Sequence, residues 1–362
     1  MRIALLTYST RPRGGVVHTL ALAEALAGLG ESVTVWTLGR GGDGGFFRRV
    51  APAVTVVVVP FPDLAGEGVG ARVLRSISVL GKAFAERRHE YDIVHAQDCI
   101  SANAAGRCIR TVHHLDQFST AELAACHERA IVEPYRHVCV SAAVAGELRA
   151  GWGIEATVIP NGVDAPRFAA AAGPAAAVER AGWRGRLGRY VLAVGGIEPR
   201  KGTRELVEAM ALLGRDDVRL VLAGGETLFD YRDYRAAVLE LAARRGVEPV
   251  LLGPVEDDAL PALVAAADVF AFPSTKEGFG LAAMEALAAG VPLVTSDLPV
   301  LREVFAGAAW FAADPARLAE LIARALCGPD PALRARGRAL AGRHTWAAAA
   351  QAHRALYREV MA

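Results

Sequence analysis

Short apolar runs alternate with stretches in which apolar residues recur every three or four positions, first over residues 1–160 and again over residues 190–361. The first pattern predicts β-strands and the second predicts helices with one apolar face. In the first half we expect strands at 1–8, 32–38, 54–60, 92–96, 110–113, 137–141 and 156–160, and helices at 20–29, 71–87, 121–130 and 142–150. The run at 54–60 is apolar on both faces, which is typical of a parallel sheet covered on two sides.

The second half repeats the alternation. We expect strands at 190–195, 219–223, 249–252, 268–272, 292–295 and 309–312, and helices at about 203–213, 230–245, 257–266, 280–289, 315–327 and 346–361. Residues 169–177 are mostly small and include a Gly-Pro pair, so they are predicted to link two domains. The sequence therefore predicts an α/β protein with two doubly wound, Rossmann-like domains, 1–165 and 166–345, and a ligand site in the cleft between them.

Composition narrows the class of protein. A chain of 362 residues is long enough for two domains, and 40 basic against 39 acidic residues give no sign of a nucleic-acid partner. The five cysteines form no C-x-x-C pair and show no metal-ligand spacing with the nine histidines, so we expect reduced thiols and no metal. The apolar run at 3–6 is too short for a signal peptide, and no 18-residue apolar span lacks a charge. A cytoplasmic location is expected, with peripheral membrane contact left open.

Two carboxylates flank a glycine-rich turn in the second half. Glu277 precedes and Glu285 follows Gly278 and Gly280, where a strand must turn into a helix. Glycines let a ligand approach the main chain, and the N–H groups of a first helical turn favour anions. Glu285 falls on an otherwise apolar helix face, where burial of a carboxylate is costly unless the group has a partner. The plain alternatives are a surface glutamate for Glu285 and, for Glu277, an acid that interacts with the helix dipole.

Other polar clusters follow other predicted strands: Gly14 with Gly15, residues 95–98, His113 with His114, and residues 195–202. Gly14 and Gly15 lack the G-x-G-x-x-G spacing, so a plain tight turn and a phosphate contact are both open. A histidine at a strand end is either structural or functional, and the fold position favours function for His113. His114 is expected to be exposed, and His18 is a weaker candidate for ligand contact.

Together these clusters resemble the glycosyltransferases of the GT-B fold, family 4, over nearly the whole chain. The most specific part is the E-x7-E stretch, Glu277-Gly278-Phe279-Gly280-Leu281 followed by Glu285. The similarity also covers residues 159–164, Lys201-Gly202, residues 223–225 and Thr345-Trp346. Members of this family are retaining, hexosyltransferase-like enzymes that use nucleotide sugars. The chain looks most similar to actinobacterial-type members whose acceptor is not established.

The resemblance implies two domains that face each other across a cleft, with helix 346–362 returning to the first. It implies that Glu285 accepts hydrogen bonds from ribose hydroxyls, that Glu277 contacts the donor sugar, and that His113 approaches its reacting face. Lys201 would neutralise the diphosphate in place of a metal. The candidate catalytic residues are then His113, Glu277 and Lys201, and the candidate ligand-binding residues are Gly14, Gly15, Arg200, Lys201, Glu277, Gly278, Phe279, Gly280, Leu281 and Glu285.

The chain departs from the family pattern at one position. An arginine commonly follows the last glycine of the strand, but here Gly196 takes its place. Arg200 could supply the lost charge, or Arg11 or Arg13 could reach across the cleft. Because adjacent side chains diverge on most backbones, we expect Lys201 to make the contact.

The expected activity is retaining transfer of a sugar from a UDP- or GDP-linked donor to an unidentified acceptor, which could be a small molecule, a glycan or a lipid-linked compound. No further cofactor is expected. The main-chain contacts to the base are expected near 252–255, the acceptor loops at 9–18, 61–72 and 114–122, and a hinge near residue 165. One alternative is a two-domain binding protein without transferase activity. Another is an enzyme that hydrolyses or epimerises a sugar nucleotide.

Overall fold

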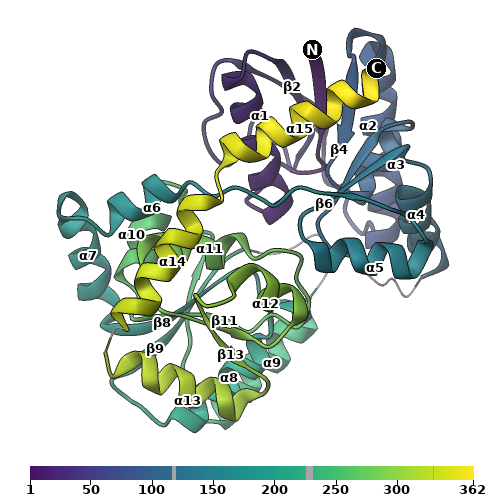
Figure 1. The fold of residues 1–362 in the computed structure, drawn as a ribbon. Coiled ribbons are helices and arrows are strands. Elements are labelled where there is room, and N and C mark those ends of the chain that lie inside the picture. Colours follow the sequence, from purple (N-terminus) through teal and green to yellow (C-terminus); the bar gives the residue numbers. More distant parts are fainter. Residues whose placement is uncertain (116–119, 226–230, 329) are drawn as a thin grey trace. The chain divides into compact units, whose positions relative to one another are not determined.

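The computed structural model describes residues 1–115, 120–225, 231–328 and 330–362, which form two compact units (Figure 1). Unit 1 comprises Met1–Gly162 and Trp346–Ala362, and unit 2 comprises Val163–Thr345. Each unit is a parallel sheet covered by helices, so the α/β architecture with two Rossmann-like sheets is confirmed. Within the described ranges, no helix is long and apolar enough to cross a membrane.

Unit 1 contains, in its described part, a seven-stranded parallel sheet with the order β3-β2-β1-β4-β5-β6-β7. Its strands are β1 (Arg2–Leu6), β2 (Ser32–Arg40), β3 (Val54–Phe61), β4 (Ile93–Ala96), β5 (Ile109–Val112), β6 (Arg136–Cys139) and β7 (Thr157–Val158). Its helices are α1 (Gly14–Gly28), α2 (Val69–Arg87), α3 (Cys99–Ala105), α4 (Ala121–Val132), α5 (Ala142–Trp152) and α15 (Trp346–Met361).

The two faces of this sheet are covered by different helices. Apolar residues of α1 and α15 pack on one face, and those of α2 and α3 pack on the other. The final helix α15, drawn in yellow, lies along α1 (Figure 1). Residues from both the amino-terminal and the carboxyl-terminal parts of the chain therefore lie near the carboxyl ends of β1, β4 and β5.

Unit 2 contains, in its described part, a six-stranded parallel sheet with the order β10-β9-β8-β11-β12-β13. Its strands are β8 (Arg189–Val194), β9 (Val218–Ala223), β10 (Val250–Gly253), β11 (Val269–Phe272), β12 (Leu293–Ser296) and β13 (Trp310–Ala312). Its helices are α6 (Ala165–Ala171), α7 (Ala177–Leu187), α8 (Thr203–Leu213), α9 (Arg232–Arg244), α10 (Leu260–Ala266), α11 (Leu281–Ala289), α12 (Pro299–Phe305), α13 (Pro315–Leu326) and α14 (Pro331–Arg343).

Some expectations from the sequence are wrong in detail. Residues 169–177 do not form a linker: α6 and a 3₁₀ turn, Pro174–Ala176, take up most of them, and they belong to unit 2. Alanine is the best helix former, so a run of small residues favours a helix until glycine or proline interrupts it. Helices α3, α7, α12 and α14 were also not predicted: α3 and α12 have only seven residues, and α7 and α14 are rich in arginine, alanine and glycine.

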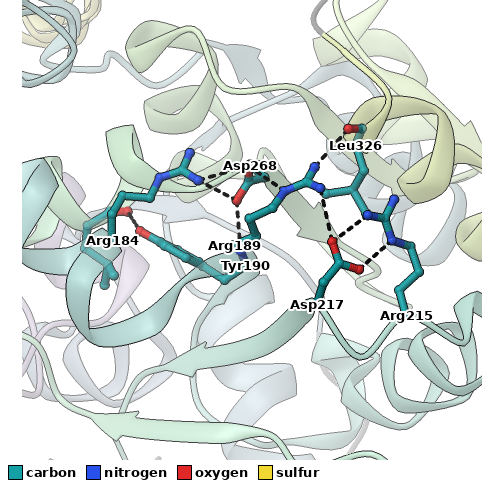
Figure 2. A network of polar contacts seen from close by, with 8 residues as sticks. Arg184, Arg189, Tyr190, Arg215, Asp217, Asp268 and Leu326 are labelled. Carbon is teal, nitrogen blue, oxygen red and sulfur yellow. Dashed lines mark hydrogen bonds and ion pairs between the residues drawn. The ribbon is translucent and has the colours of Figure 1, made fainter.

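A polar network fixes the amino-terminal end of β8 in unit 2 (Figure 2). The Asp268 carboxylate accepts from the Tyr190 N–H at 2.8 Å and from the Arg184 guanidinium at 2.9 Å. Next to it, Arg189 pairs with Asp217 at 3.2 Å. These contacts tie β8 to the start of β11, so the two strands end side by side at the opposite edge.

Candidate active site

The turn after β8 is pressed against the end of β11. Gly202 has a φ of +63°, and a Cβ at this position would lie 1.8 Å from the carbonyl oxygen of Pro273. The N–H of Thr275 donates to the carbonyl oxygen of Arg200 at 2.9 Å. Only glycine fits here, for conformation and for space. The 3₁₀ turn that precedes it, Pro199–Lys201, is thus held against the stretch that carries the first glutamate.

Two adjacent cations converge on that glutamate. Lys201 Nζ donates to Glu277 Oε2 at 2.9 Å, and Arg200 Nη1 lies 3.7 Å from the same oxygen. Arg200 also pairs with Glu198 at 2.8 Å. The side chains of Lys201 and Glu277 are only 18% and 13% exposed, so this ion pair is poorly screened by water. The expectation that Arg200 and Lys201 diverge is wrong, because the tight 3₁₀ turn brings both to one side.

The helix that follows starts without a capping side chain. Gly280, with a φ of +95°, is the N-cap of α11, and a Cβ there would lie 3.0 Å from the Phe305 ring. No acidic residue lies in the first turn of α11. The Gly278 N–H donates to Glu277 Oε1 at 3.4 Å, and the main chain at Phe279 and Leu281 presents N–H groups at a helix start that favours an anion.

Glu285 lies one turn into α11 and is half-buried. Burial raises the pKa of Glu285 to about 8; Arg167 opposes the shift, and the carboxylates of Asp257 and Asp164 add to it. Arg167 itself pairs with Asp257 at 2.8 Å. Glu285 is thus not a surface glutamate, and it carries a proton over much of the neutral range. Sequence reasoning missed Arg167, whose only signal is its position just after the 159–164 motif.

His113 follows β5 in unit 1 and lies against the start of α1. Gly14 and Gly15 are not in a free turn but are the first two residues of that helix, and a Cβ on Gly15 would lie 3.6 Å from the His113 ring. The rings of His18 and His113 are 4.8 Å apart, and His18 Nδ1 lies 2.9 Å from Asn161 Oδ1. The Nε2 atoms of both histidines are buried, and neither has a hydrogen-bond partner among the residues that the structure describes. Burial, reinforced by neighbouring cationic groups, lowers the pKa of His113 to about 3.

Behind this pair lies a buried histidine cluster that includes the final helix. His95 uses both ring nitrogens, at 2.7 Å from the Tyr357 hydroxyl and 2.7 Å from Thr111 Oγ1. His353 from α15 lies 5.6 Å from His95, ring to ring, and 6.2 Å from His18. His95 is therefore structural rather than a ligand contact. No pattern in the sequence indicates that His353, far along the chain, joins this cluster.

The remaining candidates are placed as follows. His114, expected to be exposed, is half-buried, and residues 116–119 of the expected acceptor loop 114–122 lie outside the described residues. Arg11 and Arg13 belong to unit 1, where the Arg13 guanidinium lies 5.8 Å from the Tyr8 ring. In the described part of the chain, no group of three or more His, Cys, Asp or Glu could hold a metal ion.

Solved structures of similar architecture define the class. Sucrose-phosphate synthase from Thermosynechococcus elongatus superposes with a TM-score of 0.80 at 21% identity, over 99% of this chain and 98% of that one. HepE from Anabaena, solved with UDP-glucose, gives a TM-score of 0.75 at 20% identity, over 100% of this chain and 99% of that one. At these identities the likeness shows the fold, which is the GT-B fold of glycosyltransferases.

The sequence comparisons identify the family within that class. Residues 187–339 match "Glycosyl transferases group 1", and residues 12–167 match "Glycosyltransferase Family 4". D-inositol 3-phosphate glycosyltransferase of Salinispora arenicola is 30% identical over 92% of this chain and 85% of that protein. Phosphatidyl-myo-inositol mannosyltransferase of Mycobacterium leprae is 28% identical over 84% of this chain and 80% of that protein. The chain therefore belongs to glycosyltransferase family 4.

The family settles the choice between the classes of function considered from the sequence. The protein is a glycosyltransferase, and the alternative hypothesis of a binding protein without transferase activity is not favoured. Several motif residues that carried the resemblance follow the carboxyl ends of strands in both units, whereas Glu285 lies inside α11 and Trp346 begins α15.

Proposed function

We propose that the protein transfers a sugar from a nucleotide diphosphate sugar to an acceptor hydroxyl, with retention at the anomeric carbon and without a metal ion. The observation that carries the proposal is the convergence of Lys201 and Arg200 on Glu277, beside the uncapped start of α11. A carboxylate for sugar hydroxyls thus lies next to cations and N–H groups that suit a diphosphate.

The donor would bind along this edge of unit 2. Glu285 accepts hydrogen bonds from the ribose hydroxyls, and Glu277 accepts from hydroxyls of the sugar. Lys201 and Arg200 bind the diphosphate together with main-chain N–H groups at 279–281. Arg200 supplies the charge that an arginine at position 196 would give, because its guanidinium already reaches the same carboxylate as Lys201. The base lies near 252–255, where β10 ends at a glycine with a φ of +67°.

The reaction proceeds on one face of the sugar. The acceptor oxygen attacks the anomeric carbon as the bond to the diphosphate oxygen breaks, and the acceptor proton passes to that leaving oxygen. Lys201 and Arg200 stabilise the negative charge that develops on the diphosphate. His113, held neutral by burial, offers a ring nitrogen to a donor-sugar hydroxyl and orients the reacting face.

The donor base and the acceptor are proposed by class. Some relatives are mannosyltransferases by name, and HepE was solved with UDP-glucose, so UDP- and GDP-linked sugars are the donors to test first. Two relatives are named for inositol phosphate or phosphatidylinositol, which makes a polyhydroxylated acceptor, soluble or lipid-linked, the first class to screen.

Calorimetric titration with UDP and with GDP tests the donor site directly. We expect one of the two nucleotides to bind to the wild type and to bind more weakly to Glu285→Ala. If neither nucleotide binds, UDP- and GDP-linked sugars are excluded as donors. Incubation of the matching nucleotide sugars with and without acceptors then tests transfer. Turnover that needs no acceptor would mean hydrolysis. The anomeric configuration of the product, read by NMR, tests retention, and full activity in EDTA tests independence from metals.

We also propose that the enzyme works on the cytoplasmic side, where nucleotide sugars are made, with peripheral contact to the membrane if its acceptor is a lipid. Fractionation of cells that express a tagged full-length chain tests this. Recovery only from an extracytoplasmic fraction would contradict it.

A further inference from the structure

Arg40, the last residue of β2, is a buried arginine whose guanidinium has no partner among the described residues. It is only 8% exposed, and its Nε atom is buried and makes no hydrogen bond. No hydrogen bond or ion pair joins its guanidinium to any residue that the structure describes. A guanidinium cannot lose its proton in a protein, and a buried charge is costly unless it is paired. Such a side chain indicates that its partner is a ligand.

The residues around Arg40 lie near the start of α2. Arg40 lies two positions after Leu38, so both side chains project to the same side of the sheet, where Leu38 packs in a core cluster with residues of α2. Its register partner on β3 is Phe61, and the guanidinium of Arg75, from the second turn of α2, lies 3.8 Å from the Phe61 ring. The Arg40 side chain is thus directed toward the amino-terminal end of α2.

The amino-terminal end of α2 has features that favour the binding of an anion. Gly68 is the N-cap and makes no side-chain cap hydrogen bond, and the first turn contains no acidic residue. A Cβ added to Gly66, Gly68 or Gly70 would meet nothing within 4 Å, so the main chain is open to approach. Because α2 has 19 residues, its dipole and its first N–H groups favour negative charge at this end.

The fixed charges nearby leave an excess of positive charge. Burial lowers the pKa of Arg40. The positive charges of Arg72 and Arg11 lower this pKa further, and the negative charge of Asp63 partly offsets the shift. These charges therefore all lie near the Arg40 guanidinium. The Arg75 guanidinium is already paired with the Glu67 carboxylate through two hydrogen bonds of 2.6 Å. Arg11 lies 3.9 Å from the Asp43 carboxylate, so the three arginines face two carboxylates, Asp63 and Asp43, and the net balance is still positive.

We propose that Arg40, the first turn of α2 and Arg72 form a binding site for a phosphate group of the acceptor. A phosphate oxygen would accept from the Arg40 guanidinium while others accept from the N–H groups after Gly68. The inference rests on the proposed function, since this edge of unit 1 includes the expected acceptor loop 61–72. The phosphate could belong to a soluble phosphate ester or to a phospholipid headgroup.

The test measures thermal stabilisation of the full chain by inorganic phosphate, with Arg40→Gln as the key variant. For the wild type we expect a melting temperature that rises with phosphate concentration. Arg40→Gln should weaken the apparent affinity about tenfold or more, because a charge-assisted contact is lost. Without phosphate, Arg40→Gln should melt at the same temperature as the wild type or higher, because a buried unpaired charge is removed.

Two further variants keep the result interpretable. Arg87→Gln removes the same charge from the exposed far end of α2, where Arg87 pairs with Glu90, and it should leave the phosphate response unchanged. Arg72→Gln, in the half-buried first turn, should weaken the response in the same direction as Arg40→Gln and replaces it if that variant fails to fold. No response of the wild type, or an equal response in Arg40→Gln, overturns the proposal.

Two arms distinguish the sources of the phosphate. In the first, inositol 3-phosphate replaces inorganic phosphate. In the second, vesicles of phosphatidylcholine with and without phosphatidylinositol are tested for co-flotation. Arg40-dependent binding in either arm identifies the source, and its absence from both counts against the site. Titration of the same proteins with UDP and GDP separates this inference from the proposed function: a bound nucleotide without a phosphate response refutes the phosphate site alone.

Discussion

The amino group of Lys201 lies 2.9 Å from Glu277 Oε2, so the cation proposed for the diphosphate is already paired with the carboxylate proposed for the sugar. Arg200 reaches the same oxygen at 3.7 Å. A diphosphate that binds here must share these cations with Glu277, and this competition makes the two partners of the ion pair respond in opposite directions.

Replacement of Lys201 by methionine should weaken binding of the nucleoside diphosphate about tenfold and lower kcat on the order of a hundredfold, because charge on the leaving group loses its stabilising partner. Titration calorimetry and steady-state rates measure the two effects. Lys82→Met, on an exposed position of α2, is the matched control and should behave as the wild type. Equal kcat in Lys201→Met and the control would contradict the role of Lys201.

Replacement of Glu277 by glutamine should instead tighten diphosphate binding, by a few-fold, because Lys201 loses its carboxylate partner and Arg200 keeps only its pair with Glu198. Transfer should nevertheless fall, because an amide is a poorer acceptor for sugar hydroxyls than a carboxylate. Calorimetry with the diphosphate and rates with the nucleotide sugar separate the two. Weaker diphosphate binding in Glu277→Gln would mean that Glu277 mainly orients the cations.

Binding of nucleotide should release a proton from Glu285. Burial raises the pKa of Glu285 to about 8, and ribose hydroxyls, as donors, favour the ionised form. Calorimetry at neutral pH in buffers of different ionisation enthalpy measures the release, which Glu285→Gln should abolish. Because the pKa is higher in the folded than in the unfolded chain, this group favours folding below its usual range, and the benefit is lost as pH rises toward 8. Glu285→Gln should therefore be more stable than the wild type at about pH 8.

The periodic patterns predicted most strands and long helices of both units, because parallel strands buried on two faces and helices with one apolar face leave strong local signals. They also located the carboxyl-terminal edges at which Glu277 and His113 lie. The convergence of Arg200 and Lys201 depends on a close approach at Gly202, which only the folded backbone shows. Arg40 gave no signal, because an arginine that ends a strand is ordinary until its burial and lack of a partner are known.

Unit 1 should lose stability as the pH falls below neutral. Burial lowers the pKa of His18, His95, His113 and His353, so they are neutral when folded but take up protons near the usual pKa when unfolded. The free energy of unfolding, measured with urea, should decline as the pH falls from about 6.5 toward the values of about 3 and 4 for His113 and His353.

Matched histidine variants test this source of the pH dependence. His353→Phe keeps a ring in the cluster and should reduce the slope by up to about one proton. His89→Gln, at an exposed position, should not change it. The same slope in His353→Phe and the wild type would mean that other groups control the acid sensitivity.

Two neighbouring glycines provide the sharpest test of His113. A Cβ on Gly15 would lie 3.6 Å from the His113 Cδ2 atom and 3.7 Å from its Nε2, whereas a Cβ on Gly14 would meet nothing within 4 Å. Both residues open α1, so alanine at either should leave stability unchanged or raise it by up to about 1 kcal/mol. Only Gly15→Ala should restrict access to the buried Nε2 and lower kcat several-fold. Melting temperatures and rates of the two variants check this, and equal rates would mean that the sugar does not approach His113 from the side of Gly15.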